Sequence, residues 1–305
     1  MTHTIQTKLN NKLLCLLCYS FYCLLLSSLN AAAENSMTTE NIEHTDTLKI
    51  VRNIQYSEAA GEKGYGDLFL PQDVESPRTV LLIHGGAWKH MTRQRVQQVA
   101  AFIAEQGYAV FNVSYRLLPQ APYPACEVDC IDAAKFLLEG EHPAIQALDR
   151  SQIVVGGLSA GGHLALVTGL KLPTEQIAGI LDICGPTELH APELEGLMRS
   201  SGLAKDEPNK MEIFKAASPT LLAAEKESLP PLLVLHCQQD GIVNIKQAYR
   251  IMDVWNQAGA NLQAFLYEGN PKGGHNIWRT GKSEPDLHYK LEHQIISFLN
   301  SFFQK

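Results

Sequence analysis

One short stretch, residues 153–163, constrains the fold of this chain more than any other. An apolar β-branched run leads into Gly157-Leu158-Ser159-Ala160-Gly161, and a run rich in alanine and leucine follows. This order predicts a strand, a tight turn and a helix, and glycines two residues either side of a serine fit a turn without room for side chains. The turn would hold Ser159 in a strained conformation with its hydroxyl above the edge of a sheet. The dipole of the following helix would favour negative charge at that point.

Apolar strands alternate with helical segments along the rest of the chain. Continuous apolar runs, typical of strands buried on both faces, predict strands at residues 79–83, 108–115, 177–184, 231–236 and 262–267. Helices are expected at residues 93–106, 126–138, 160–172, 245–258 and 286–303. The alternation predicts an α/β fold with a mostly parallel central sheet and helices on both faces. Residues 185–226 are less regular, and we expect them to form a small lid-like insertion.

The first 33 residues differ from the remainder. Lys8 and Lys12 precede the apolar residues 13–26, and Ala31 and Ala33 stand at the small-residue positions of a cleavage site. This pattern predicts a secretory signal peptide over residues 1–33, export to the periplasm or the medium, and no stable membrane insertion after cleavage. The alternative is a membrane anchor, but the apolar core is short for a span of ~20 residues. With no linker in the remainder, we expect residues 34–305 to form a single domain.

Composition excludes several classes of function. The net charge is −7 and no long basic run occurs, so nucleic acid is not an expected partner. The four cysteines outside the leader are too few for a disulfide framework, and we expect free or buried thiols; they are Cys126, Cys130, Cys184 and Cys237. After residue 33, no Cys-x-x-Cys or His-x-x-x-His spacing occurs, so no metal site is predicted.

A serine hydroxyl becomes a nucleophile only beside a base, and the base needs an acid to orient it. Asp240 and His275 each follow an expected strand beside glycine, and loops after parallel strands meet at one edge of the sheet. Ser159, His275 and Asp240 are therefore the predicted nucleophile, base and acid. Asp182 also ends a strand and is the alternative acid.

Three other histidines are close to these motifs, but we expect them to be structural: His84, His163 and His236.

The segment His84-Gly85-Gly86-Ala87-Trp88 follows the expected strand 79–83. Successive small residues let backbone N–H groups turn inward and bind an oxyanion. Gly86 and Ala87 are the predicted donors together with Ala160, and Gly85 is an alternative. Trp88 is predicted to contact the substrate. Glu188 and Trp278 are further candidates for the pocket wall.

With these motifs in order, the chain resembles the α/β-hydrolase fold esterase/lipase superfamily, from about residue 67 to the C-terminus. That group includes polysaccharide acetyl and feruloyl esterases, hormone-sensitive-lipase-like carboxylesterases and kynurenine formamidases. The resemblance rests on six motifs: His84-Gly85-Gly86-Ala87-Trp88, Ser114-Tyr115-Arg116-Leu117, Gly157 to His163, Ala217-Ser218-Pro219, Asp240-Gly241-Ile242-Val243 and Gly274-His275. Three features depart from the usual pattern and affect loop shape: Ala87 in place of a frequent glycine, Cys237 after the strand histidine, and the long approach 269–275.

The resemblance implies a serine carboxylic ester hydrolase that forms an acyl-enzyme and needs no cofactor or metal. Its expected substrate is a small-molecule or carbohydrate ester, with short acyl or hydroxycinnamoyl groups on sugars or polysaccharides. An aryl formamidase or another amidase would use the same three residues and is the alternative enzyme. A catalytically inactive hydrolase fold used for binding is a third reading.

Overall fold

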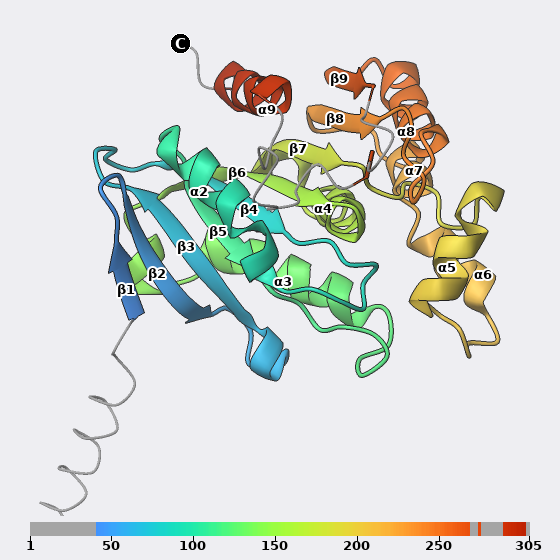
Figure 1. Ribbon diagram of the computed structural model, residues 1–305, viewed down its shortest axis with the longest axis horizontal. Helices are drawn as coiled ribbons and strands as arrows, with labels where there is room; N and C mark the ends of the chain where they lie inside the picture. The colour runs from blue at the N-terminus through green and yellow to red at the C-terminus, as the bar shows by residue number, and fades with distance from the viewer. Residues whose placement is uncertain (1–40, 269–273, 276–288, 303–305) are drawn as a thin grey trace, which may run out of the picture. The chain divides into compact units, whose positions relative to one another are not determined.

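The computed structural model describes residues 41–268, 274–275 and 289–302. Within these residues the core is a nine-stranded sheet in the order β1-β2-β3-β5-β4-β6-β7-β8-β9 (Figure 1). Two strand pairs at one end of the sheet are antiparallel: β2 (Leu48–Gln55) pairs with β3 (Tyr65–Pro71), and β3 pairs with β5. The outermost strand, β1, spans Asn41–His44.

The other six strands are parallel, and they carry the apolar runs read from the sequence. They are β4 (Arg78–Ile83), β5 (Ala109–Val113), β6 (Asp149–Leu158), β7 (Ile177–Ile183), β8 (Leu232–Cys237) and β9 (Leu262–Tyr267). In β4, Leu81 and Ile83 belong to one apolar core, whereas Val80 and Leu82 belong to another. Successive side chains point to opposite faces of a strand, so the sheet is buried on both sides.

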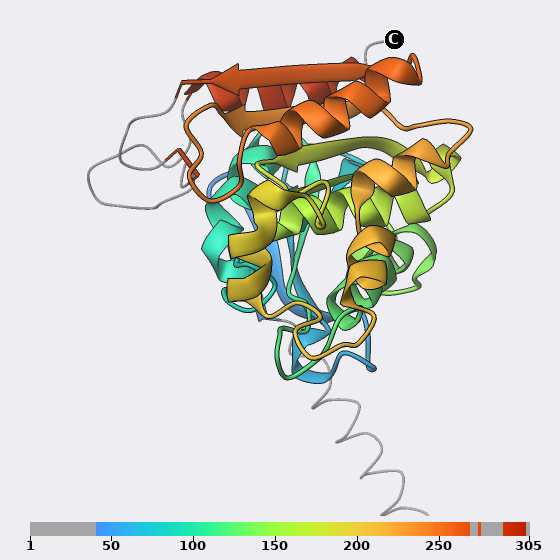
Figure 2. The ribbon, with the colours of Figure 1, turned by 90° about the vertical axis from the view of Figure 1, so that its right-hand side faces the viewer.

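Helices cover both faces (Figures 1 and 2). Apolar residues of α2 (Gln97–Glu105) and α9 (Tyr289–Ser301) belong to one core. Those of α3 (Ala125–Glu139), α4 (Ala160–Lys171) and α8 (Lys246–Gln257) belong to the other. The predicted α/β architecture with a mostly parallel sheet is therefore confirmed.

Residues 185–226 contain four short helical segments after β7. These are η5 (Pro192–Leu194), α5 (Glu195–Ser201), α6 (Lys210–Ala216) and α7 (Pro219–Ala224). Leu194, Met198 and Phe214 from this segment pack into the same core as α4. The segment is thus anchored to the body of the fold by apolar side chains.

The four cysteines that follow residue 33 are free and buried. Among the described residues, no helix combines the length and the apolar character needed to span a bilayer. The predicted signal peptide lies outside the described residues.

Candidate active site

The turn between β6 and α4 is as tight as the sequence predicts. Ser159 has φ 55° and ψ −120°, a conformation that is strained for a residue with a side chain. A Cβ atom on Gly157 would lie 2.2 Å from the carbonyl oxygen of Gly161, and one on Gly161 would lie 2.2 Å from that of Ile83. Only glycine fits these two positions, and the backbone between them holds the serine at the edge of the sheet.

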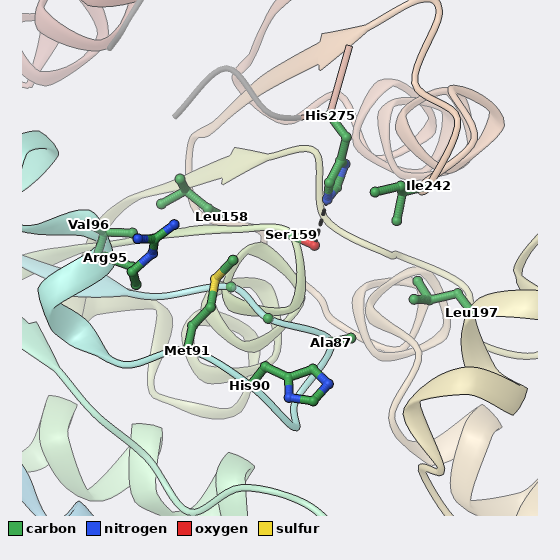
Figure 3. A pocket seen from close by; sticks show the side chains of 12 residues that line it. Ala87, His90, Met91, Arg95, Val96, Leu158, Ser159, Leu197, Ile242 and His275 are labelled. Carbon is green, nitrogen blue, oxygen red and sulfur yellow. Dashed lines mark hydrogen bonds between the residues drawn. The ribbon is translucent and has the colours of Figure 1, made fainter. Parts of the chain in front are cut away.

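Three side chains distant in sequence form a hydrogen-bonded series at this edge. Figure 3 shows two of them, Ser159 and His275. The Oγ of Ser159 lies 2.9 Å from Nε2 of His275, and Nδ1 of His275 lies 2.7 Å from Oδ2 of Asp240. With Nδ1–H donating to the carboxylate, Nε2 is free to accept the serine proton. Asp240 follows β8 and His275 follows β9, so both come from the carboxyl ends of parallel strands.

The carboxyl group of Asp240 is buried but remains ionised. Burial alone would raise its pKa, but the hydrogen bond and charge of His275 and the N–H groups of Ile242 and Val243 together lower the pKa below its usual value. His236 lies nearby, with Nε2 3.6 Å from Oδ2 of Asp240. Burial lowers the pKa of His236, and its Nε2–H donates to the Val243 carbonyl, so this ring is neutral. The negative charge therefore faces the ring of His275.

Asp182, the alternative acid, lies elsewhere. It is fully buried in β7, and its Oδ1 accepts a hydrogen bond of 2.9 Å from the N–H of Gly185. Its Oδ2 has no partner within the described part of the chain. Burial raises the pKa of this carboxyl to about 7. The structure thus places Asp240, and not Asp182, against His275.

The burial of Asp182 predicts a specific pH dependence of stability. The pKa of Asp182 is raised in the folded protein. Its protonation therefore contributes fully to the free energy of unfolding below the pKa of about 3.9 in the unfolded chain, and this contribution is lost as the pH rises through about 7. Asparagine cannot ionise, so Asp182→Asn should become progressively more stable relative to the native chain between pH 4.5 and pH 7.5. Thermal melts across this range measure the difference. A difference in melting temperature that stays constant with pH would contradict the assignment.

The loop after β4 adopts an unusual backbone. Gly86, Ala87 and Trp88 have successive positive φ values of 112°, 51° and 58°. A Cβ atom on Gly86 would lie 2.1 Å from the carbonyl oxygen of His90. No hydrogen bond between described residues uses the backbone N–H of Gly86 or Ala87, and both residues line a cavity with Ser159. Ala160 begins α4, so its N–H lacks an intrahelical acceptor.

Trp88 does not occupy the position that we expected. It is fully buried, and its indole N–H donates to Nδ1 of His163 at 3.2 Å. The Nε2–H of His163 in turn donates to the carbonyl of Ala217, and burial lowers the pKa of His163 to about 4. A large ring with one polar atom is satisfied inside the protein when that atom finds a partner. The structure therefore places Trp88 behind the loop, as a support, and not in the cavity.

His84 is also an internal residue of this loop. Its ring stacks on that of Tyr115, with centroids 4.3 Å apart, and its Nδ1 lies 2.7 Å from the Gly85 carbonyl oxygen. Burial lowers the pKa of His84 to about 4. Like His163, it is a neutral structural histidine.

A cavity of about 330 Å³ opens beside Ser159 and His275 (Figure 3). Most of its wall could not be predicted from the sequence; the wall includes Met91, Arg95, Val96, Leu158, Leu197 and Ile242. Leu197 belongs to α5, so the segment 185–226 does contribute to the cavity. Glu188 does not line it and pairs instead with Arg250 at 3.3 Å. Trp278 lies outside the described residues.

One group of three potential metal ligands occurs among the described residues: Cys184, Asp240 and His275, with ligand atoms within 4.8 Å of one another. Asp240 and His275 already bond to each other. Burial raises the pKa of the Cys184 thiol well above its usual range, so it stays protonated and is a poor ligand. The arrangement is better suited to proton transfer than to metal binding.

The sequence also matches a known protein family. The model of the BD-FAE family matches residues 67–254, which is more than half of the chain. The chain belongs to the BD-FAE family. The matched range includes Ser159 and Asp240 and ends before His275.

The BD-FAE chain is also similar to individual proteins. It is 24% identical over 246 residues to Esterase LipC of Mycobacterium tuberculosis, covering 73% of this chain and 58% of that protein. The structure of Esterase B from Lactobacillus rhamnosis has a TM-score of 0.70 at 18% identity, with 92% and 94% of the two chains covered. A truncated carbohydrate esterase from gut microbiota has a TM-score of 0.67 at 19% identity, with 88% and 99% covered.

These likenesses show the α/β-hydrolase fold that the sequence resemblance implied. The BD-FAE chain spans less than two thirds of the length of the first curated relatives that it matches.

Proposed function

We propose that this protein hydrolyses carboxylic esters through an acyl-enzyme formed on Ser159. The observation that carries the proposal is the hydrogen-bonded series of Asp240, His275 and Ser159 at the carboxyl edge of the sheet. The names of relatives such as Esterase LipC agree with it.

In the first half of the reaction, Oγ of Ser159 attacks the ester carbonyl while Nε2 of His275 takes the hydroxyl proton. The carbonyl oxygen becomes an oxyanion, and we propose that the N–H groups of Gly86, Ala87 and Ala160 bind it. The tetrahedral intermediate then collapses as His275 gives its proton to the leaving alcohol, and an ester of Ser159 remains.

Water completes the reaction on the same groups. His275 removes a proton from the water as it attacks the acyl-enzyme, and it returns the proton to Oγ of Ser159 when the acid leaves. Asp240 keeps the Nδ1–H tautomer of His275 and stabilises the imidazolium formed in each half. Its low pKa keeps it ionised for this role.

We further propose short acyl or hydroxycinnamoyl esters of sugars or polysaccharides as substrates. The cavity volume of about 330 Å³ is at the lower end of the usual range for ligand sites. Its walls are mostly apolar, which suits a small acyl or aromatic group. Met91 and Ile242 at the wall are nearly half exposed, so a larger polar alcohol can remain in solvent.

The test is a substrate screen with purified protein. We expect p-nitrophenyl acetate to be hydrolysed faster than N-formylkynurenine. If acylation is faster than deacylation, the reaction should begin with a burst of p-nitrophenol equal to the enzyme concentration. Methyl ferulate and acetylated xylan then test the acyl and sugar preferences. Faster turnover of N-formylkynurenine would identify an amidase instead, and no turnover of any substrate would favour a binding role.

We also propose that the protein is exported after cleavage of residues 1–33. The support is the basic, apolar and small-residue order at the N-terminus. N-terminal sequencing of protein from the native host should give Glu34, in the periplasmic or secreted fraction. A chain beginning at Met1 in the cytosolic fraction would contradict this proposal.

A further inference from the structure

An arginine lines the same cavity as the serine and the histidine. Arg95 belongs to η2 (Arg93–Val96), the short helical segment between the loop after β4 and α2. Figure 3 shows it on the opposite side of Ser159 from Leu197 and Ile242. Among the described residues that line the cavity, none is Asp or Glu. The only fixed charge in this part of the wall is therefore positive.

Arg95 differs from every other arginine that the structure describes. Six of the others pair with carboxylates, and one donates to backbone carbonyl groups; they are Arg52, Arg78, Arg93, Arg116, Arg199, Arg250 and Arg150. Arg95 has neither kind of partner among the described residues. The chain carries 32 acidic and 25 basic residues, so carboxylates are in excess. Within the described part of the chain, the guanidinium of Arg95 is therefore left for a ligand in the cavity that it shares with Ser159 and His275.

The backbone that carries Arg95 is held rigidly. Arg93, two residues earlier, is buried, and its Nε lies 3.0 Å from Oδ1 of Asp67. It also donates to Oγ of Ser114 at 3.1 Å, and its carbonyl accepts from Nδ2 of Asn112 at 2.8 Å. Val96, one residue later, is buried in the apolar core. These contacts fix the backbone from which the exposed side chain of Arg95 projects.

We propose that Arg95 binds a carboxylate of the substrate, so that the preferred substrates are esters that also carry a carboxylate group. The inference rests on the proposed esterase function. Guanidinium and carboxylate form paired charge-assisted hydrogen bonds, and the exposed side chain of Arg95 is accessible to such a group. The carboxylate is part of either the acyl group, as in a half-ester of a dicarboxylic acid, or the alcohol, as in an acylated sugar acid.

Two matched pairs of substrates distinguish these sources. Mono-p-nitrophenyl adipate and p-nitrophenyl hexanoate have acyl chains of equal length and differ by the carboxylate. 4-Acetoxybenzoate and its methyl ester differ in the charge of the alcohol part. We expect kcat/KM to favour the charged member of one pair by about tenfold, which corresponds to about 1.4 kcal/mol, and added salt to weaken this preference.

Arg95→Gln should lose the preference: kcat/KM for the charged ester falls about tenfold, mainly through KM, while that for its neutral partner changes less than twofold. Arg95→Lys should keep part of it, because lysine retains the charge but not the planar fork. Arg78→Gln is the matched control, since it removes the same charge at the start of β4, the far end of the sheet from Ser159. It should leave both values unchanged.

Equal losses on charged and neutral esters in Arg95→Gln, or no charge preference in the native enzyme, would overturn the proposal while leaving the esterase function intact. Ligand-observed NMR can measure the binding of adipic acid monoamide, and this measurement needs no hydrolysis. Weaker binding to Arg95→Gln than to the native protein and to Arg78→Gln supports the assignment even if no ester is turned over. Equal binding to all three proteins refutes it.

Discussion

Ser159→Ala should lower kcat for p-nitrophenyl acetate by roughly a millionfold, the loss expected when a nucleophile that acts as a unit with its base is removed. The methyl side chain of alanine cannot attack the carbonyl, and His275 then has no hydroxyl to deprotonate. The backbone conformation at φ 55° is retained by the glycines around it, so the variant should fold. Steady-state kinetics at saturating substrate and a circular dichroism melt measure the two effects.

Ser151→Ala provides the control for this substitution. Ser151 is an exposed residue at the beginning of the same strand, β6, and its hydroxyl bonds only to Asp149 among the described residues. Its replacement should leave kcat within twofold of the native value. A fluorophosphonate probe should label the native protein and Ser151→Ala at Ser159 and should not label Ser159→Ala. Near-normal activity of Ser159→Ala, or labelling of another residue, would refute the role of Ser159.

Asp240→Asn should lower kcat by about 10⁴-fold, as the loss of the orienting carboxylate does in a serine protease triad. The amide would donate to Nδ1 of His275, which favours the tautomer with a proton on Nε2 and leaves no base facing the serine. The N–H groups of Ile242 and Val243 can still bond to the remaining amide oxygen, so the loop should keep its shape. KM should change much less than kcat.

Asp182→Asn is the comparison that decides between the two acids. Asp182 bonds to the N–H of Gly185 and has no hydrogen bond to His275, so its replacement should retain most of the activity. A loss of about tenfold would be compatible with a disturbed turn beneath the serine. If Asp182→Asn were the more damaging change, the orienting acid would be Asp182, and the Asp240 loop would have only a structural role.

Much of the fold could be predicted because its determinants are local. The strands β4, β6 and β7 contain runs of mostly apolar residues. The tight turn at Ser159 is marked by glycines whose positions leave no space for a Cβ atom. The helix expected at residues 93–106 is partly different: the structure has η2 over Arg93–Val96 before α2 begins at Gln97. Apolar spacing over so few residues does not distinguish the two helix types, and contacts of Arg93 with β3 and β5 determine the local shape.

The sequence also predicted that Ser159, His275 and Asp240 lie close together. Parallel strands bring the loops at their carboxyl ends to one edge of the sheet, whatever the details of packing. Sequence alone left Asp182 as a rival, since it satisfies the same rule. Only the tertiary structure separated them, by burying Asp182 under the turn and placing Asp240 2.7 Å from the His275 ring.

Side-chain direction is the property that the sequence did not determine. Trp88 belongs to a motif that favours a place beside the substrate, but the position of His163 on α4 gives its indole N–H a buried partner and turns the ring inward. Arg95 belongs to no motif, and only the structure shows that it lines the cavity and has no carboxylate partner among the described residues. Local patterns encode chain conformation through sterics and burial, whereas the surroundings of a side chain depend on contacts between residues far apart in the sequence. The tight turn at Ser159 and the chain order of Ser159, Asp240 and His275 could therefore be predicted from the sequence, whereas the residues of the cavity wall depend on the tertiary structure.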